Sequence, residues 1–179
     1  MEKDIVYFDL ETRFTAGDVG GWGHKAKMGI SVAATYSTKL GKYRVFLQDD
    51  VQDLIDQLRK ADLVVGFNHV GFDYEVLMGF TILDLKEQLI SFDLLVDLQK
   101  QLGHRISLEA VATPTLGMGK SADGLQAIRW WQQGKVLEIA RYCCFDVKVT
   151  KCVHEYGRQH GHVKYHDRAG RVQEVKVDW

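Results

Sequence analysis

The sequence lacks several features that mark particular classes of protein. Pro114 is the only proline, and no low-complexity tract or internal repeat is present, so nothing indicates a linker between domains. No apolar run approaches the roughly 18 residues of a transmembrane helix. Met1 is followed by the polar residues Glu2, Lys3 and Asp4 instead of a basic stretch leading into an apolar one. We therefore expect a soluble, unexported protein with no membrane partner.

Cysteine is also scarce. Cys143, Cys144 and Cys152 lie close together in a segment with helical periodicity, which suits neither a disulfide framework nor a CxxC zinc site. We expect small buried side chains in a reducing cytoplasm, and therefore a cytoplasmic location.

The composition fits one folded domain. The chain has 179 residues, of which 46% are hydrophobic, enough for one core but short for two. Its net charge is -1, yet residues 1–100 carry 11 basic and 16 acidic side chains, and residues 101–179 carry 12 and 8. Metal ligands could explain part of the acidic excess, with the more basic second half facing phosphates. An ordinary scatter of solvated charges explains it equally well.

The order of apolar patterns predicts a mixed sheet covered by helices, which is an α/β fold class. A loop rich in glycine follows the first strand, and Ser107 is placed to cap a helix. Residues 163–165 and 172–177 form a terminal hairpin. Strands are expected at 5–10, 30–36, 43–47 and 63–66, and helices at 51–60, 93–102 and 134–160.

Three short motifs carry candidate chemistry. Asp9 and Glu11 stand two apart on a predicted strand, so both carboxylates point to one face while Leu10 turns into the core. Such a pair alone is more often a solvated strand surface than a metal site.

The second motif, Asn68 with Asp73, follows a predicted strand that ends at Gly66, where binding groups often lie in α/β folds. Asp73 alone could equally be a helix cap. In the third motif, Tyr142 and Asp146 stand one helical turn apart, a spacing that usually gives no more than an exposed polar pair.

Together, the three motifs resemble those of the DEDD exonucleases, in the branch that carries a tyrosine (DEDDy). The matching residues are Asp9-Leu10-Glu11, Asn68-x-x-x-Phe72-Asp73 and Tyr142-x-x-x-Asp146. This residue pattern is similar to those of the proofreading domains of family B DNA polymerases and of stand-alone domains found beside helicases. The histidine-bearing branch places its histidine where this chain has Arg141.

The resemblance runs from about Ile5 to Gly157 and implies a ribonuclease H-like fold with a mixed five-stranded sheet. It divides the single domain, residues 1–179, into a nuclease core at about 4–160 and a C-terminal hairpin at about 161–179.

The activity implied is 3′→5′ exonucleolytic hydrolysis of single-stranded DNA or RNA by a two-metal mechanism, with Mg²⁺ or Mn²⁺ as the two divalent cations. Asp9 would bridge both ions, Glu11 and Asp146 would complete the site of the attacking water, and Asp73 would hold the second ion. Tyr142 would orient the nucleophile. Substrate contacts are implied for Leu10, Thr12, Asn68 and Phe72.

Several alternatives stay open at this stage. The chain could be a non-catalytic interaction module that kept the fold, an endonuclease, or the nuclease partner of a helicase or polymerase. Trp22, Phe67, Phe72 and Trp130 could stack on bases, although core burial is the better expectation for most of them. We expect no dedicated metal site among the histidines at 154, 160, 162 and 166, which are solvated or contact phosphates.

Overall fold

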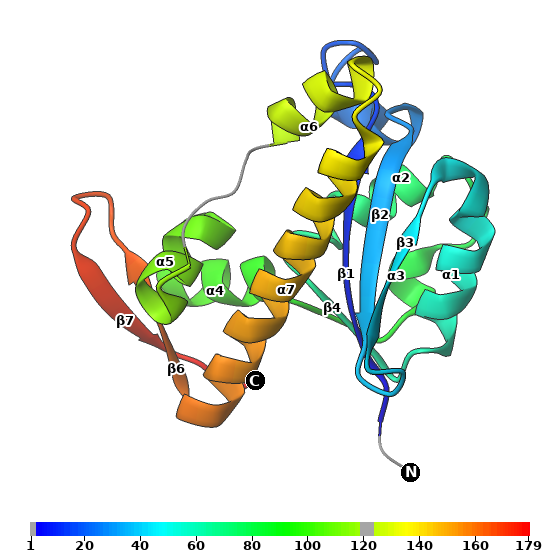
Figure 1. Cartoon of the computed structure of the whole chain (residues 1–179). Helices are drawn as coiled ribbons and strands as arrows, with labels where there is room; N and C mark the ends of the chain where they lie inside the picture. The colour runs from blue at the N-terminus through cyan, green and yellow to red at the C-terminus, as the bar shows by residue number, and fades with distance from the viewer. Residues whose placement is uncertain (1–2, 119–123) are drawn as a thin grey trace.

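The computed structural model describes residues 3–118 and 124–179. One five-stranded sheet has helices on both faces, and a two-stranded hairpin lies beyond the helices of one face (Figure 1). In chain order the strands and helices are β1 (Ile5–Thr12), η1 (Trp22–Lys27), β2 (Ile30–Ser37), β3 (Lys42–Phe46), η2 (Gln48–Asp50), α1 (Val51–Lys60), β4 (Leu63–Gly66), α2 (Asp73–Leu77), α3 (Leu85–Gln88), β5 (Ser91–Asp93), α4 (Leu94–Leu102), α5 (Leu108–Leu116), α6 (Gly124–Gln132), α7 (Val136–His160), β6 (His162–His166) and β7 (Val172–Lys176).

The sheet has the strand order β3-β2-β1-β4-β5, with β1 at its centre. β1 pairs antiparallel with β2 and parallel with β4, and β4 pairs parallel with β5. The expected mixed five-stranded sheet and α/β class are confirmed. The parallel strands β1, β4 and β5 end at the same edge, which brings the segments after them together.

Alternation along β1 separates two cores. Val6, Phe8 and Leu10 face the cluster that includes the buried side of α1, whereas Tyr7 faces the cluster formed with α7. Because side chains on a strand alternate with a period of two, Asp9 and Glu11 lie on the α7 side, the same side as Tyr7. This places the first motif under the helix that carries the third.

α7 is the longest helix and crosses the sheet against β1 and β2 (Figure 1). Ile139, Cys143 and Val147 are fully buried along its inner face. The helix begins at Val136, two residues later than expected, because Gly134 adopts a left-handed backbone with φ 70° that interrupts helical geometry. The expected end near His160 is confirmed.

Two other expectations needed correction. The helix expected to start at Asp93 starts at Leu94, because Asp93 ends the short strand β5 and caps α4 with its side chain. Part of the glycine-rich loop is a 3-10 helix, η1, not an irregular excursion throughout.

The C-terminal hairpin is confirmed as β6 and β7, and it packs on α5. The Thr115 hydroxyl donates to the Lys164 carbonyl oxygen at 2.8 Å and accepts from the Lys164 N–H at 2.9 Å. Ser107 caps α5 as expected, since its Oγ accepts the Ala110 N–H at 3.1 Å. Within residues 3–118 and 124–179, none of the helices combines the length and apolar character needed to span a bilayer.

Candidate active site

A hollow of about 680 Å³ opens between the end of β1, the loop after β4 and the first turns of α7. All nine residues to which the family resemblance gave a catalytic, metal-binding or substrate-binding role border this hollow. The nine residues are Asp9, Leu10, Glu11, Thr12, Asn68, Phe72, Asp73, Tyr142 and Asp146. Their roles stay predictions, but their convergence from three separate segments is a property of the fold.

Three of the four acids form a compact group. Asp9, Glu11 and Asp146 each present a carboxylate oxygen, and these oxygens lie within 4.8 Å of one another. Glu11 is buried and the other two are partly buried. The group combines two strand neighbours with one helix residue, and oxygen ligands this close can share a hard divalent cation.

Asp73 enters the site differently. Its Oδ1 accepts the backbone N–H of Leu10 at 2.9 Å, which ties the loop after β4 to β1. Asp73 is the first residue of α2, and the cap position belongs to Phe72, so the interpretation of Asp73 as only a helix cap is wrong. The Leu10 N–H is engaged by this bond and is not available to a substrate, although the expected burial of the Leu10 side chain is confirmed.

The four acidic side chains of the site lie close together in buried surroundings that disfavour their charged forms. Burial raises the pKa of Asp9 well above its usual range, and the charges of Asp73, Glu11 and Asp146 raise it further. Burial also raises the pKa of Asp73 to about 7 and that of Asp146 to about 6. Among the described residues that border the hollow, none is Lys or Arg. Bound cations would relieve this repulsion, and an all-oxygen donor set suits Mg²⁺ or Mn²⁺.

Tyr142 lies one turn before Asp146 on α7, as the spacing predicted. Its hydroxyl lies near Asp146 and interacts favourably with the charged carboxylate, which opposes the rise in the pKa of that carboxyl. Burial, followed by the charges of Glu11, Asp146 and Asp9, raises the pKa of Tyr142. The phenol therefore stays protonated at neutral pH and acts as a hydrogen-bond donor.

The contact between Cys143 and Asp9 was not predicted from the sequence. The Cys143 Sγ lies 3.4 Å from Oδ2 of Asp9 and 3.3 Å from the Asp9 carbonyl oxygen. Burial raises the pKa of this thiol, so it remains able to donate. The expected burial of Cys143 is confirmed, but only the crossing of α7 over β1 reveals its bond to Asp9.

Aromatic side chains form one wall of the hollow. Trp22 borders it with 67% of its surface exposed, and its ring meets Phe72 edge to face with centroids 6.4 Å apart. Of the four candidates for base stacking, Trp22 is thus exposed, and Phe67, Phe72 and Trp130 are partly buried against the cores. Phe14, which the sequence analysis did not single out, also borders the hollow. Trp130 does not; it packs edge to face against Tyr142.

A second, shallower hollow of about 520 Å³ adjoins the first. The two share Phe67 and Asn68, and Arg105 and Ser107 border the second. An exposed cation thus stands beside the acidic hollow, across the loop that carries Asn68.

His154 is buried, whereas the other three histidines near the C-terminus are exposed or partly buried. Within the described residues, the acidic group is the only set of at least three His, Cys, Asp or Glu side chains placed to share a metal ion. His154, however, is buried, and its Nδ1 lies 2.9 Å from the Tyr7 hydroxyl, so the expectation that it is solvated was wrong.

Comparison with known proteins places this geometry in a family. The model of the RNase H superfamily matches residues 6–155. No curated protein matches this chain. Among solved structures, the family B DNA polymerase from the hyperthermophilic archaeon Pyrobaculum calidifontis is similar with a TM-score of 0.67 and 17% identity. The match covers 88% of this chain and 25% of the polymerase chain, and at this identity it shows a shared fold alone. The family match extends over most of the chain, and the chain therefore belongs to the RNase H superfamily.

Proposed function

We propose that this protein is a metal-dependent 3′→5′ exonuclease of the DEDDy type that hydrolyses single-stranded DNA or RNA. The observation that carries the proposal is the convergence of Asp9, Glu11 and Asp146 within 4.8 Å inside a hollow that Asp73 and Tyr142 also border. Membership of a superfamily that contains nucleases supports hydrolysis of phosphodiesters as the reaction class.

The donor set fits two divalent cations. Asp9, Glu11 and Asp146 would hold one ion, and Asp73 would help Asp9 to hold the other. When bound, such ions make hydroxide available at neutral pH and offset charge on the leaving 3′ oxygen. The raised pKa values of Asp73 and Asp146 mean that cations compete with protons for these carboxylates near neutral pH.

Tyr142 supports the tyrosine-bearing branch of the family. Its hydroxyl is a donor at neutral pH and already contacts Asp146, so we assign it the orientation of the attacking water and not its deprotonation. Arg141 occupies the position of the general base in the histidine-bearing branch and carries no group able to accept a proton.

The substrate side of the site favours a single strand. Trp22 and Phe72 offer faces on which bases can stack, and Thr12 and Asn68 offer polar groups beside the acids. The adjoining hollow with Arg105 provides a cation for a phosphate upstream of the terminal nucleotide. The polymerase similarity concerns the fold, and we propose an independent nuclease that needs neither a polymerase nor a helicase partner for cleavage.

The proposal is tested with matched linear and circular oligonucleotides of DNA and RNA in Mn²⁺. We expect linear substrates to release nucleoside 5′-monophosphates from the 3′ end and circular substrates to remain intact. Cleavage of circles would indicate an endonuclease. Binding of the strand without cleavage in Mn²⁺, or in Mg²⁺ in its place, would indicate a non-catalytic module.

A further inference from the structure

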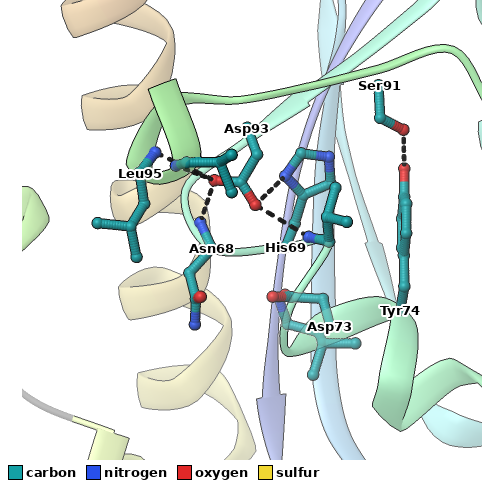
Figure 2. Close-up of polar contacts among 10 residues, drawn as sticks. Asn68, His69, Asp73, Tyr74, Ser91, Asp93 and Leu95 are labelled. Atoms are coloured by element: carbon teal, nitrogen blue, oxygen red, sulfur yellow. Dashed lines mark hydrogen bonds and ion pairs between the residues drawn. The ribbon is translucent and has the colours of Figure 1, made fainter. Parts of the chain in front are cut away.

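Asp93 is a buried carboxylate that the proposed chemistry does not use. It stands where β5 passes into α4, and Figure 2 shows its two oxygens directed at the loop after β4. Oδ1 accepts the Asn68 N–H at 2.8 Å, and Oδ2 accepts the Val70 N–H at 3.0 Å. Oδ1 also accepts the Leu95 N–H at 3.0 Å, which caps α4. One side chain therefore joins the loop to a helix.

The loop needs such support at Asn68. Within the described residues, Asn68 is the only non-glycine residue with a positive φ, which is 67°. Asparagine tolerates this left-handed region better than most residues, but the conformation persists only where the surroundings hold it. The bonds to Asp93 fix the backbone at Asn68 and again two residues later, at Val70.

His69 fills the space beneath the loop without tethering it. A Cβ built on Gly66 would lie 2.7 Å from the His69 ring, so the imidazole rests directly on the end of β4. Neither ring nitrogen has a hydrogen-bond partner, and the contact of Nδ1 with Asp93 is long at 3.5 Å. Burial lowers the pKa of His69 to about 4, so the ring is neutral at physiological pH. The side-chain bonds that hold the start of the loop are therefore those from Asp93, beside the backbone bonds from the Phe72 N–H to the Asn68 carbonyl oxygen and from the Tyr74 N–H to the His69 carbonyl oxygen, both at 2.9 Å.

Three of the four proposed metal-binding acids lie outside the loop that Asp93 holds, since Asp9 and Glu11 belong to the central strand and Asp146 belongs to α7. Asp73 follows the loop directly, but its bond to the Leu10 N–H gives it a second attachment, to β1. Asn68 borders both hollows, and its backbone geometry depends directly on Asp93. Loss of the Asp93 bonds should therefore displace Asn68 more than any of the acids.

We propose that Asp93 is a positioning residue for the nucleic-acid strand, acting through Asn68. The inference rests on the proposed nuclease function and adds a division of labour to it: Asp9, Glu11, Asp73 and Asp146 serve the hydrolytic step, whereas Asp93 sets strand binding. A change at position 93 should consequently appear in KM and not in kcat.

The test is a double-mutant cycle in Mn²⁺ with a 5′-labelled oligonucleotide. Asp93→Ser keeps an oxygen that can cap α4 but is too short to reach the loop. Asn68→Gly removes the side-chain amide and accepts the positive φ without strain. We expect each single variant to raise KM about tenfold with kcat within about threefold, and the double variant to be no worse than Asn68→Gly, because the two residues act as one unit.

A matched control separates this role from loss of a helix cap. Asp84 caps α3 by accepting the Lys86 N–H at 3.0 Å and has no contact with the loop. Asp84→Ala should leave both constants unchanged. Additive effects of Asp93→Ser and Asn68→Gly, or a fall in kcat at constant KM, would overturn the proposal. If circular dichroism shows that Asp93→Ser is unfolded, Asp93→Asn, which retains one acceptor oxygen, enters the same cycle with a smaller expected rise in KM.

The same set of variants is compared without catalysis by measuring the Kd for the labelled oligonucleotide in Ca²⁺, using fluorescence anisotropy. There we expect Kd to follow the pattern of KM. If the wild type binds the strand tightly but never cleaves it, the nuclease function is contradicted. The Kd values of the single and double variants would still show whether positions 68 and 93 act as one unit, and so would still test the role of Asp93. Failure of the wild type to bind the strand at all would overturn both.

Discussion

The Leu10 N–H donates to Oδ1 of Asp73 at 2.9 Å, and this bond joins the strand of the first motif to the loop of the second. It explains how Asp73 raises the pKa of Asp9 without belonging to the group of three acids within 4.8 Å. The bond fixes Asp73 beside β1 at the border of the hollow, where under the proposed function it would help to hold a second ion.

The stability of the metal-free protein should depend on pH through Asp73. Its pKa of about 7 exceeds the ordinary value of an unfolded chain, so between about pH 4 and 7 the folded state binds more protons. This contribution is fully present below about pH 4 and is lost as the pH rises through 7. Asp73→Asn keeps an oxygen for the Leu10 N–H and removes the titration.

The measurement is Tm by calorimetry in EDTA. We expect the variant to gain on the wild type by on the order of 5 °C between about pH 5 and 7.5. His69 and His154, whose lowered pKa values act in the opposite direction, are common to both proteins and cancel in the difference. A difference in Tm that stays constant with pH would contradict the raised pKa of Asp73.

Divalent cations should stabilise the fold. Binding to the folded state alone raises Tm, and saturating Mn²⁺ should add about 5 °C or more. Asp9→Asn removes a charge that both proposed ions would share and should lose most of that gain, whereas Asp84→Asn, at an exposed acid outside the acidic group, should keep it. Equal gains for wild type and Asp9→Asn would place the ions elsewhere.

Tyr142→Phe separates the hydroxyl from the ring. The ring should remain packed against Trp130, and only the interaction of the hydroxyl with Asp146 and its proposed contact with the attacking water should be lost. Single-turnover cleavage should fall by on the order of 10²-fold, with the Mn²⁺ gain in Tm preserved. Asp146→Ala should remove both activity and most of the gain. Full activity of Tyr142→Phe would reduce the tyrosine to a packing residue.

The effect of Arg105 on binding affinity should depend on the length of the strand. Arg105 borders the second hollow, beyond Asn68, and under the proposed function it would contact a phosphate upstream of the terminal nucleotide. Arg105→Ala should weaken binding of a long oligonucleotide by about fivefold and leave a dinucleotide unaffected, and the salt dependence should shrink for the long strand only. Equal weakening for both lengths would argue against this path.

Most of the sheet could be predicted from the sequence, because β1, β2 and β4 are apolar runs of ordinary strand length. β5 could not, because its three residues are too few for a period to register and the strand forms only by pairing with β4. The late start of α7 follows from the left-handed backbone at Gly134, a conformation that composition alone does not reveal.

The grouping of the acids could be predicted because the three motifs together resemble those of a known family, although no single spacing indicates a site. The contacts of Cys143 with Asp9 and of Asp93 with Asn68 were not, because each joins segments that only the tertiary fold brings together. The sequence left Trp22 undecided between a core position and a base-stacking position, because an aromatic residue in a glycine-rich loop gives no periodic signal that distinguishes the core from the wall of a hollow.

The most direct test of the central claim is one gel of a 5′-labelled single-stranded oligonucleotide incubated with Mn²⁺. The wild type should produce a ladder that shortens one nucleotide at a time from the 3′ end, and EDTA or Asp9→Asn should leave the oligonucleotide intact. A labelled mononucleotide as the first product, or an unchanged ladder with Asp9→Asn, would contradict the account.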